Sequence, residues 1–220
     1  MKRVIFIVLI SLLAIKGFSQ SSDLGNWLIY FGNKKINKNW NWHHEVQYRN
    51  YNAIGDLEQL LLRTGIGYNL TEDNNNILLG YGFINSQNYL PSTDEKQGIN
   101  EHRIYQQFIT RQNIGRVNVQ HRYRFEQRCI ESQDFRMRFR YFLAFSIPLN
   151  NKEMIDKTFY LSSYNEIFLN HNDNVFDRNR LYGGIGFKLN KQARVEIGYM
   201  NQFLNNGNRD QINLITFLNF

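Results

Sequence analysis

The residues best suited to chemistry are six arginines in the segment 122–140, which alternate with aromatic and aliphatic residues. Successive side chains of a strand point to opposite faces, so the pattern predicts two strands that are cationic on one face and apolar on the other. Fixed guanidinium charge could draw anions into a pore, or it could form ion pairs that fill a narrow interior. The arginines are Arg122, Arg124, Arg128, Arg136, Arg138 and Arg140.

Carboxylates that could pair with these arginines lie nearby and on other predicted strands. Glu126 and Asp134 are local, and Glu45, Glu166 and Glu196 could reach across an interior. An ion-pair lattice is favoured over an anion-selective lining, because a barrel of this size is only slightly wider than one that side chains fill. The charged residues predicted to line the interior are Arg122, Arg124, Glu126, Arg128, Arg136, Arg138, Arg140, Glu45 and Glu196.

The sequence positions no nucleophile beside a base, as a hydrolase requires. His121 nevertheless has outward parity, which keeps a lipid-acting hydrolase as an alternative. We predict no metal site and no cofactor, because the adjacent His43 and His44 point to opposite faces of a strand and the segment 171–177 lacks the Gly and final Glu of an EF-hand loop. The candidate nucleophiles and bases are Ser146, Ser162, Ser163, His43, His44, His102, His121 and His171.

The elements that must position these residues are long strands, because a period of two dominates from residue 38 onward. Several runs reach about 11 to 14 residues, whereas soluble strands peak near 5 to 6 and a strand tilted across a bilayer needs about 9 to 11. The runs are 39–51, 58–70, 77–86, 101–113, 116–128, 134–147, 158–170, 180–189, 193–203 and 211–220, with a further one at 26–32.

The apolar face of these strands is predicted to meet lipid. A secreted β-sandwich or lipocalin-like barrel would also alternate, but the strand lengths, the aromatic residues at run ends and the final phenylalanine favour a membrane barrel. Backbone inside a bilayer must be satisfied within a closed sheet, and each arginine on the lipid face at mid-depth would cost about 2–4 kcal/mol. The aromatic residues at run ends are Trp40, Trp42, Tyr68, Phe203 and Phe220.

The predicted fold is therefore all-β, a transmembrane antiparallel up-and-down β-barrel of 10–12 strands. Bacterial barrels normally have even strand numbers, so the count is expected to be ten or twelve. A turn at 114–115 would pair Arg103 with Glu126, and a turn at 190–192 would pair Gly186 with Glu196. Tight turns on one side and longer connections on the other are expected, the longer ones at 87–100, 171–177 and 204–209.

The first nineteen residues have the form of a secretory signal peptide, with Lys2 and Arg3 before an apolar run and small residues near Ser19. We predict cleavage after Ser19 and a barrel domain over 20–220 in a Gram-negative outer membrane; an uncleaved anchor is the alternative.

The formal charge of +7 falls to about +4 when the three cations of residues 1–19 leave. This positive charge is too small and too evenly spread to predict nucleic-acid binding. The single cysteine, Cys129, excludes an internal disulfide.

The segment "GNWLIYFGNKKINKNWNWHHEVQYR", residues 25–49, resembles the start of the outer-membrane family catalogued as domain of unknown function 2490. "SSYNEIFLN" and the terminal "FLNF" also fit this family. The resemblance implies an outer-membrane β-barrel and transfers no functional residues. The positions that carry it are Trp27, Lys34, Lys35, Trp40, Glu45 and Arg49.

The sequence thus predicts a non-enzymatic outer-membrane protein, either a narrow channel for small solutes or a structural component. Its expected partners are outer-membrane lipid and, through Phe220, the barrel assembly machinery. The alternatives are a lipid hydrolase and a binding barrel that uses the loops 87–99 and 171–177.

Overall fold

The structure, a computed structural model, describes residues 24–52, 55–71, 74–171 and 174–220. The predicted signal peptide 1–19 and its cleavage site lie outside these residues, as does part of the loop 171–177. Eleven strands make up the described chain, and they are β1 (Gly25–Lys35), β2 (Trp40–Asn50), β3 (Leu57–Asn69), β4 (Asn75–Tyr89), β5 (Lys96–Ile114), β6 (Val117–Ile130), β7 (Arg136–Pro148), β8 (Thr158–Asn170), β9 (Phe176–Lys188), β10 (Ala193–Leu204) and β11 (Gly207–Asn219). No helix in these ranges is long and apolar enough to cross a bilayer.

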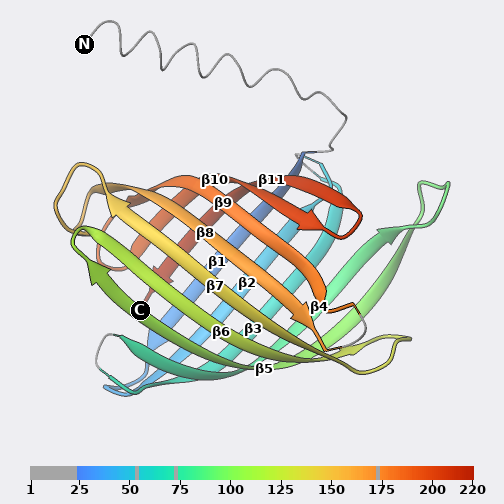
Figure 1. Cartoon of the computed structure of the whole chain (residues 1–220), viewed down its shortest axis with the longest axis horizontal. Coiled ribbons are helices and arrows are strands. Elements are labelled where there is room, and N and C mark those ends of the chain that lie inside the picture. The colour runs from blue at the N-terminus through green and yellow to red at the C-terminus, as the bar shows by residue number, and fades with distance from the viewer. Residues whose placement is uncertain (1–23, 53–54, 72–73, 172–173) are drawn as a thin grey trace, which may run out of the picture.

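The strands form one closed barrel in which each strand pairs with its neighbours along the chain (Figure 1). The barrel closes where β1 meets β11, and this one pair is parallel, from Gly25 opposite Gln211 to Asn33 opposite Asn219. All other neighbours are antiparallel. The predicted range of 10–12 strands is confirmed, but the expected even number is wrong, because the run at 26–32 is a complete strand that closes the barrel.

Because the number of strands is odd, the start of β1 and the end of β11 lie at opposite ends of the barrel. We call them the N-terminal end, where β1 begins, and the C-terminal end, where β11 finishes (Figure 1). The N-terminal end carries the connections 51–56, 90–95, 131–135, 171–175 and 205–206. The C-terminal end carries 36–39, 70–74, 115–116, 149–157 and 189–192.

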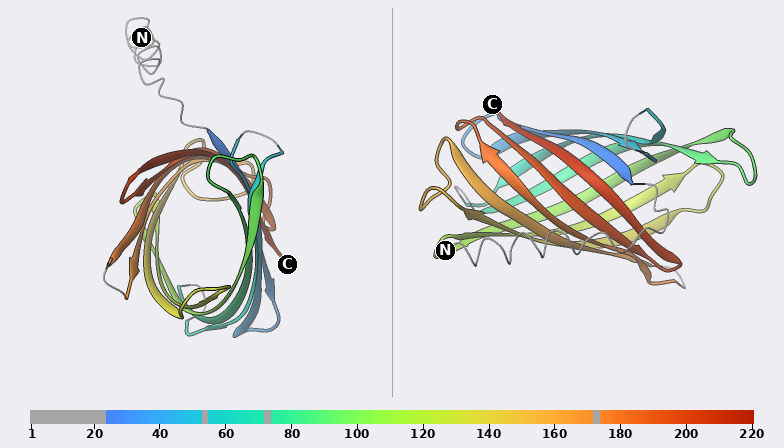
Figure 2. Two further views of the ribbon diagram at one scale, coloured as in Figure 1. Left: turned by 90° about the vertical axis from the view of Figure 1, so that its right-hand side faces the viewer. Right: turned by 90° about the horizontal axis from the view of Figure 1, so that it is seen from above.

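The connections separate by length less cleanly than predicted. The segment 149–157 is long yet lies with the tight turns, and the predicted long loop 204–209 is a tight hairpin turn at 205–206. The predicted loop 87–99 is largely strand, because β4 continues to Tyr89 and β5 begins at Lys96. Together β4 and β5 extend beyond the barrel wall as a hairpin (Figures 1 and 2).

Register fixes which side chains face inward. The predicted pairing of Gly186 with Glu196 is confirmed. The predicted pairing of Arg103 with Glu126 is wrong, because the turn lies at 115–116 and Arg103 is opposite Arg128. The error is a shift of two residues, which leaves every side chain on its predicted face.

Small residues make room for large ones on the inner wall. A Cβ atom added to Gly80 would overlap the ring of Tyr105, and one added to Gly186 would overlap the ring of Tyr160. Both tyrosines are almost completely buried, so they lie flat against the wall over the glycines. This agrees with the close packing expected for glycine within a strand.

Candidate functional site: the charged interior

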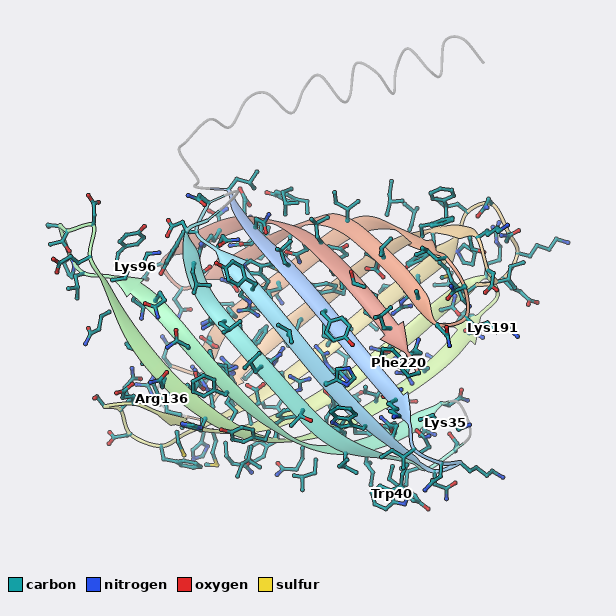
Figure 3. The ribbon with its side chains drawn as sticks, turned by 180° about the vertical axis from the view of Figure 1, so that it is seen from behind. Lys35, Trp40, Lys96, Arg136, Lys191 and Phe220 are labelled. Atoms are coloured by element: carbon teal, nitrogen blue, oxygen red, sulfur yellow. The ribbon has the colours of Figure 1, made fainter. Side chains whose placement is uncertain are left out.

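The inner wall carries nearly all the charged residues predicted to line it. Arg124, Arg138 and Arg140 are at most 4% exposed, and Glu126 is completely buried. Glu45 and Glu196 are also buried, whereas Arg122 and Arg128 are half-buried. Arg136, at the start of β7, is exposed at the N-terminal end of the barrel and is not part of the buried network (Figure 3).

Glu126 is the centre of the first cluster. Its carboxylate accepts hydrogen bonds from Arg138 Nη2 and Arg140 Nη1, each at 2.6 Å. Arg124 Nη1 lies 3.6 Å from the same carboxylate, and Arg124 Nε and Nη2 donate closer bonds to Gln107 Oε1, at 2.9 and 2.6 Å. Two guanidinium groups on β7 are thus neutralised in part by one carboxylate on β6, as charge-assisted hydrogen bonds favour.

Glu166 on β8 is the centre of the second cluster. It accepts from Arg140 Nη2 at 2.7 Å and from Arg122 Nη2 at 2.8 Å, and Arg180 Nη1 lies 4.0 Å away. Arg140 therefore bridges the two carboxylates, and the bond from Arg122 reaches over β7. A continuous ion-pair network extends from β6 to β9.

Further pairs continue the network around the wall. Arg63 pairs with Glu45 at 2.5 Å, and Arg103 and Arg128 both pair with Glu101 at 2.5 Å. Glu101 is not among the residues predicted to line the interior, although its parity in β5 places it inside. Glu196, predicted as a partner for arginines across the interior, instead accepts a hydrogen bond from Tyr160 at 2.9 Å.

Aromatic rings inside the barrel support the guanidinium groups. Arg140 and Arg180 lie over the buried ring of Phe168 from the strands on either side, at 4.4 and 4.6 Å from its centroid. Arg49 and Arg180 lie over Trp27, at 3.7 and 4.8 Å. Such stacking stabilises a guanidinium where water is excluded. The resemblance gave Trp27 and Arg49 as motif positions, and the structure shows that they are stacked.

An apolar cluster occupies the interior beside the parallel pair of strands. It consists of Trp27, Ile29, Tyr182, Met200 and Ile215, all buried. These residues come from β1, β9, β10 and β11, so the interior has an ionic side and an apolar side. Sequence reasoning missed the apolar side, because it assigned inward positions by their charge.

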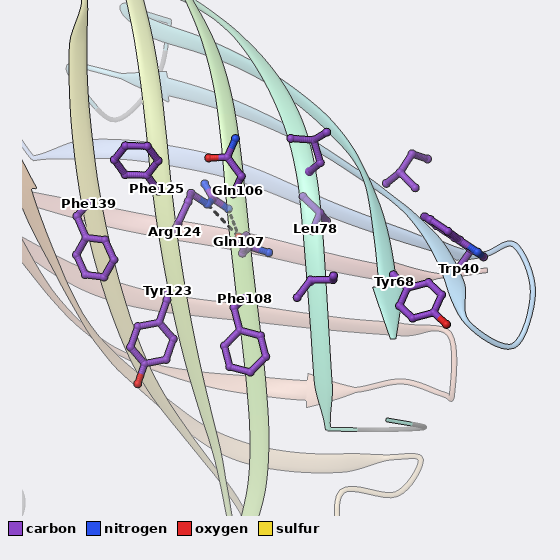
Figure 4. A pocket seen from close by; sticks show the side chains of 13 residues that line it. Trp40, Tyr68, Leu78, Gln106, Gln107, Phe108, Tyr123, Arg124, Phe125 and Phe139 are labelled. Atoms are coloured by element: carbon purple, nitrogen blue, oxygen red, sulfur yellow. Dashed lines mark hydrogen bonds between the residues drawn. The ribbon is translucent and has the colours of Figure 1, made fainter. Parts of the chain in front are cut away.

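The outer wall is apolar over most of its area. A hollow of about 740 Å³ lies on this wall across β2 to β7 (Figure 4). Gln106 is a polar side chain within it and bonds to Gln127. The apolar residues that line it include Trp40, Ile66, Tyr68, Phe108, Tyr123 and Phe139.

The candidate hydrolytic residues do not come together. Three outward histidines each bond a tyrosine hydroxyl, and in the described part of the chain no serine hydroxyl bonds a histidine. No group of three His, Cys, Asp or Glu side chains in these ranges is arranged to hold a metal ion. The histidine–tyrosine pairs are His44 with Tyr30, His102 with Tyr81 and His121 with Tyr141.

Comparison with known proteins places the chain in a family. The profile described as "Protein of unknown function (DUF2490)" matches residues 24–213. An uncharacterized protein of Methylorubrum extorquens is 31% identical over 169 residues, which cover 72% of this chain and 69% of that protein. No solved structure matches. The family match spans the whole barrel from β1 into β11, so the chain belongs to the DUF2490 family of proteins of unknown function.

Proposed function

We propose that the chain is an integral outer-membrane β-barrel with a structural role, whose interior is closed by an ion-pair network instead of forming an open pore. Two features support this proposal, one on each face of the wall. The outer face has the chemistry of a surface in contact with hydrocarbon, and the inner face has the chemistry of a packed interior.

Support from the outer face comes from large apolar side chains at outward positions around the barrel. Leu79, Ile197 and Ile104 are 60%, 56% and 53% exposed, and such residues recur on most strands. A soluble protein rarely exposes a contiguous apolar surface larger than a few hundred Å². In the closed sheet the backbone N–H and C=O groups can bond to neighbouring strands instead of water, which is the condition for spanning a bilayer.

The observation that carries the closed interior is the burial of Glu126. A carboxylate on the wall of a hydrated pore would be partly exposed to water, but Glu126 has 0% exposure and two arginines bonded to it. Bonds also pass over intervening strands, from Arg138 on β7 to Asp177 on β9 and from Arg209 on β11 to Glu58 on β3. These contacts occupy the space that a solute would need.

Bilayer recording on the purified barrel tests the closed interior. We expect the full chain to remain in the membrane fraction after alkaline extraction and to give no stable single-channel current. Stable currents whose ion preference changes with Arg138→Glu would show a pore and overturn the structural role. Release into the aqueous fraction would instead overturn the membrane location.

Orientation follows from the proposed recognition of Phe220 by the assembly machinery. Phe220 is exposed, its amide bonds to Asn33 of β1, and it lies at the C-terminal end, which on this proposal faces the periplasm. The β4–β5 hairpin would then face the outside of the cell. In a Cys129→Ser background, an impermeant maleimide should label Ser92→Cys on whole cells and leave Lys191→Cys unlabelled; the reverse pattern would contradict this orientation.

A further inference from the structure

The buried charges of the interior do not balance. Among the described residues, seven arginines are buried but only five carboxylates, all of them glutamates, and no buried lysine or aspartate alters the difference. A buried cation without a counter-charge is strongly unfavourable. The excess therefore needs a source of negative charge.

The carboxylates of Glu58, Glu45 and Glu166 already pair with arginines, although Glu58 Oε2 has no hydrogen-bond partner within the described structure. Glu58 pairs with Arg209 at 2.5 Å, and Glu45 pairs with Arg63 at 2.5 Å. Glu166 is shared between Arg140 and Arg122. None of these acids is within 4.0 Å of Arg49, which has no ion pair within the described ranges.

Arg49 and Arg180 are the two buried arginines with the weakest compensation. Arg49 donates to Gln47 and Gln59, both neutral amides, at 3.0 and 2.7 Å. Arg180 donates to the amide oxygen of Gln202 at 2.8 Å, and its nearest carboxylate contact is at 4.0 Å. Both guanidinium groups lie over the Trp27 ring, at 3.7 and 4.8 Å from its centroid, so two poorly compensated cations lie at this one side chain.

Unpartnered donors surround the same site. Trp27 Nε1 and Gln211 Nε2 are buried, and neither has a hydrogen-bond partner within the described structure. In the parallel pair Gln211 is opposite Gly25, and Gly25 precedes Trp27 by two residues on β1. Buried donors are almost always satisfied in folded proteins. Cationic and neutral donors therefore converge here, although two buried amide oxygens of β11, Gln211 Oε1 and Asn213 Oδ1, also lack a partner within the described structure.

We propose that a small inorganic anion binds inside the barrel between Arg49 and Arg180, beside Trp27 and Gln211. The anion supplies the missing charge and accepts hydrogen bonds from these donors, as anions do from guanidinium groups. Chloride and sulfate share this chemistry. The site depends on the barrel interior alone and stands whether or not the barrel spans a membrane.

Chloride titration of the folded full chain in neutral detergent tests the site. Ionic strength is held constant with gluconate, which is too large for a filled interior, and thermal unfolding and ³⁵Cl line width are recorded. We expect a saturable rise in the unfolding temperature and saturable line broadening. A parallel titration with sulfate shows which anion is preferred.

The discriminating variant is Gln59→Glu, which places a carboxylate where Arg49 already donates at 2.7 Å. It should fold without added anion and weaken chloride binding by about tenfold or more, because the charge is supplied internally. The matched control is Gln120→Glu, which makes the same change beside Arg111, bonded at 2.9 Å on the inner wall near the C-terminal end. The control should keep the wild-type chloride response.

Three outcomes would overturn the proposal. They are a linear, unsaturable chloride response in the wild type, equal responses in the wild type and Gln59→Glu, and equal losses in Gln59→Glu and Gln120→Glu. If Gln59→Glu fails to fold, Arg180→Gln takes its place, and unchanged line broadening in that variant would also refute the site.

Discussion

The two sides of the barrel interior are stabilised by different physics. From β5 to β8 the side chains are arginines and glutamates joined by short charge-assisted bonds, centred on Glu126 and Glu166. Beside the parallel pair of β1 and β11, Trp27, Met200 and Ile215 pack as an apolar cluster, with Arg49 and Arg180 over the Trp27 ring at its margin. Removing one partner of a buried ion pair lowers the free energy of unfolding strongly, because the other charge is left unpaired. Shortening a buried apolar side chain lowers it in proportion to the volume removed. The difference predicts which substitutions matter most on each side.

The largest effect is expected at Glu126. Replacing it with Gln keeps the shape but leaves Arg138 and Arg140 with much less counter-charge, so the free energy of unfolding should fall by about 3–5 kcal/mol. Urea unfolding in lipid vesicles, followed by tryptophan fluorescence, measures this change. Arg136→Gln is the matched control on the exposed end of β7 and should change the free energy by less than about 0.5 kcal/mol. A similar small change for Glu126→Gln would show that the network is hydrated and contributes little.

An intermediate effect is expected where tyrosines lie over glycines. Gly80→Ala places a methyl group in the ring of Tyr105 and should cost about 1–3 kcal/mol, because overpacking forces side chains from their preferred rotamers. Gly183→Ala is the control, since an added Cβ there meets no atom within 4 Å. The difference between the two free energies of unfolding is the test. Equal values would mean that Tyr105 moves away freely.

Sequence patterns predicted the ionic side better than the apolar side for a physical reason. Charged residues alternating with aromatics, as in Arg138, Phe139 and Arg140, have one low-energy arrangement around a barrel, so parity alone assigns their faces. In β11, Ile215 and Leu214 are both apolar, yet one is buried inside and the other is exposed outside. Alternation places Leu214 on the outer face and Ile215 on the other, but it gives no sign that the inner face is itself apolar there, so the apolar side went unpredicted.

Closure and partner choice could not be predicted from parity either. The strand count depended on whether the run at 26–32 forms a strand and on which neighbour it finds, a long-range contact with β11 that no local pattern contains. Likewise, parity placed Glu196 inside, but only the three-dimensional arrangement shows that it accepts from Tyr160. Inward position was a local property, whereas bonding partners were not.

A smaller effect is expected on the apolar side. Ile215→Val removes one buried methylene from the cluster beside Met200 and should cost about 0.5–1.5 kcal/mol, well below the loss predicted for Glu126→Gln. Leu214→Val, one residue away on the outer wall, is the matched control and should change stability less in lipid vesicles. If Ile215→Val proved as damaging as Glu126→Gln, the two sides would not differ as proposed.

The smallest effect is expected at the barrel rim, where an acid–base pair like those of the interior is only half-buried. Asp56 accepts hydrogen bonds from Lys96 and from Tyr89, which tie the β4–β5 hairpin to the connection 51–56. Burial raises the pKa of Asp56, but these hydrogen bonds and the charge of Lys96 outweigh it and hold the pKa below the ordinary 3.8.

Because the unfolded chain binds this proton more tightly than the folded chain, ionised Asp56 stabilises the fold. Its contribution to the free energy of unfolding is full above about pH 4 and is lost as the pH falls through the folded-state pKa. The unfolding temperature should therefore decrease between pH 5 and 2 by about 1–3 °C more in the wild type than in Asp56→Asn. Identical pH profiles would show that solvent screens the pair completely, and a difference as large as that at Glu126 would remove the distinction between fully buried and half-buried pairs.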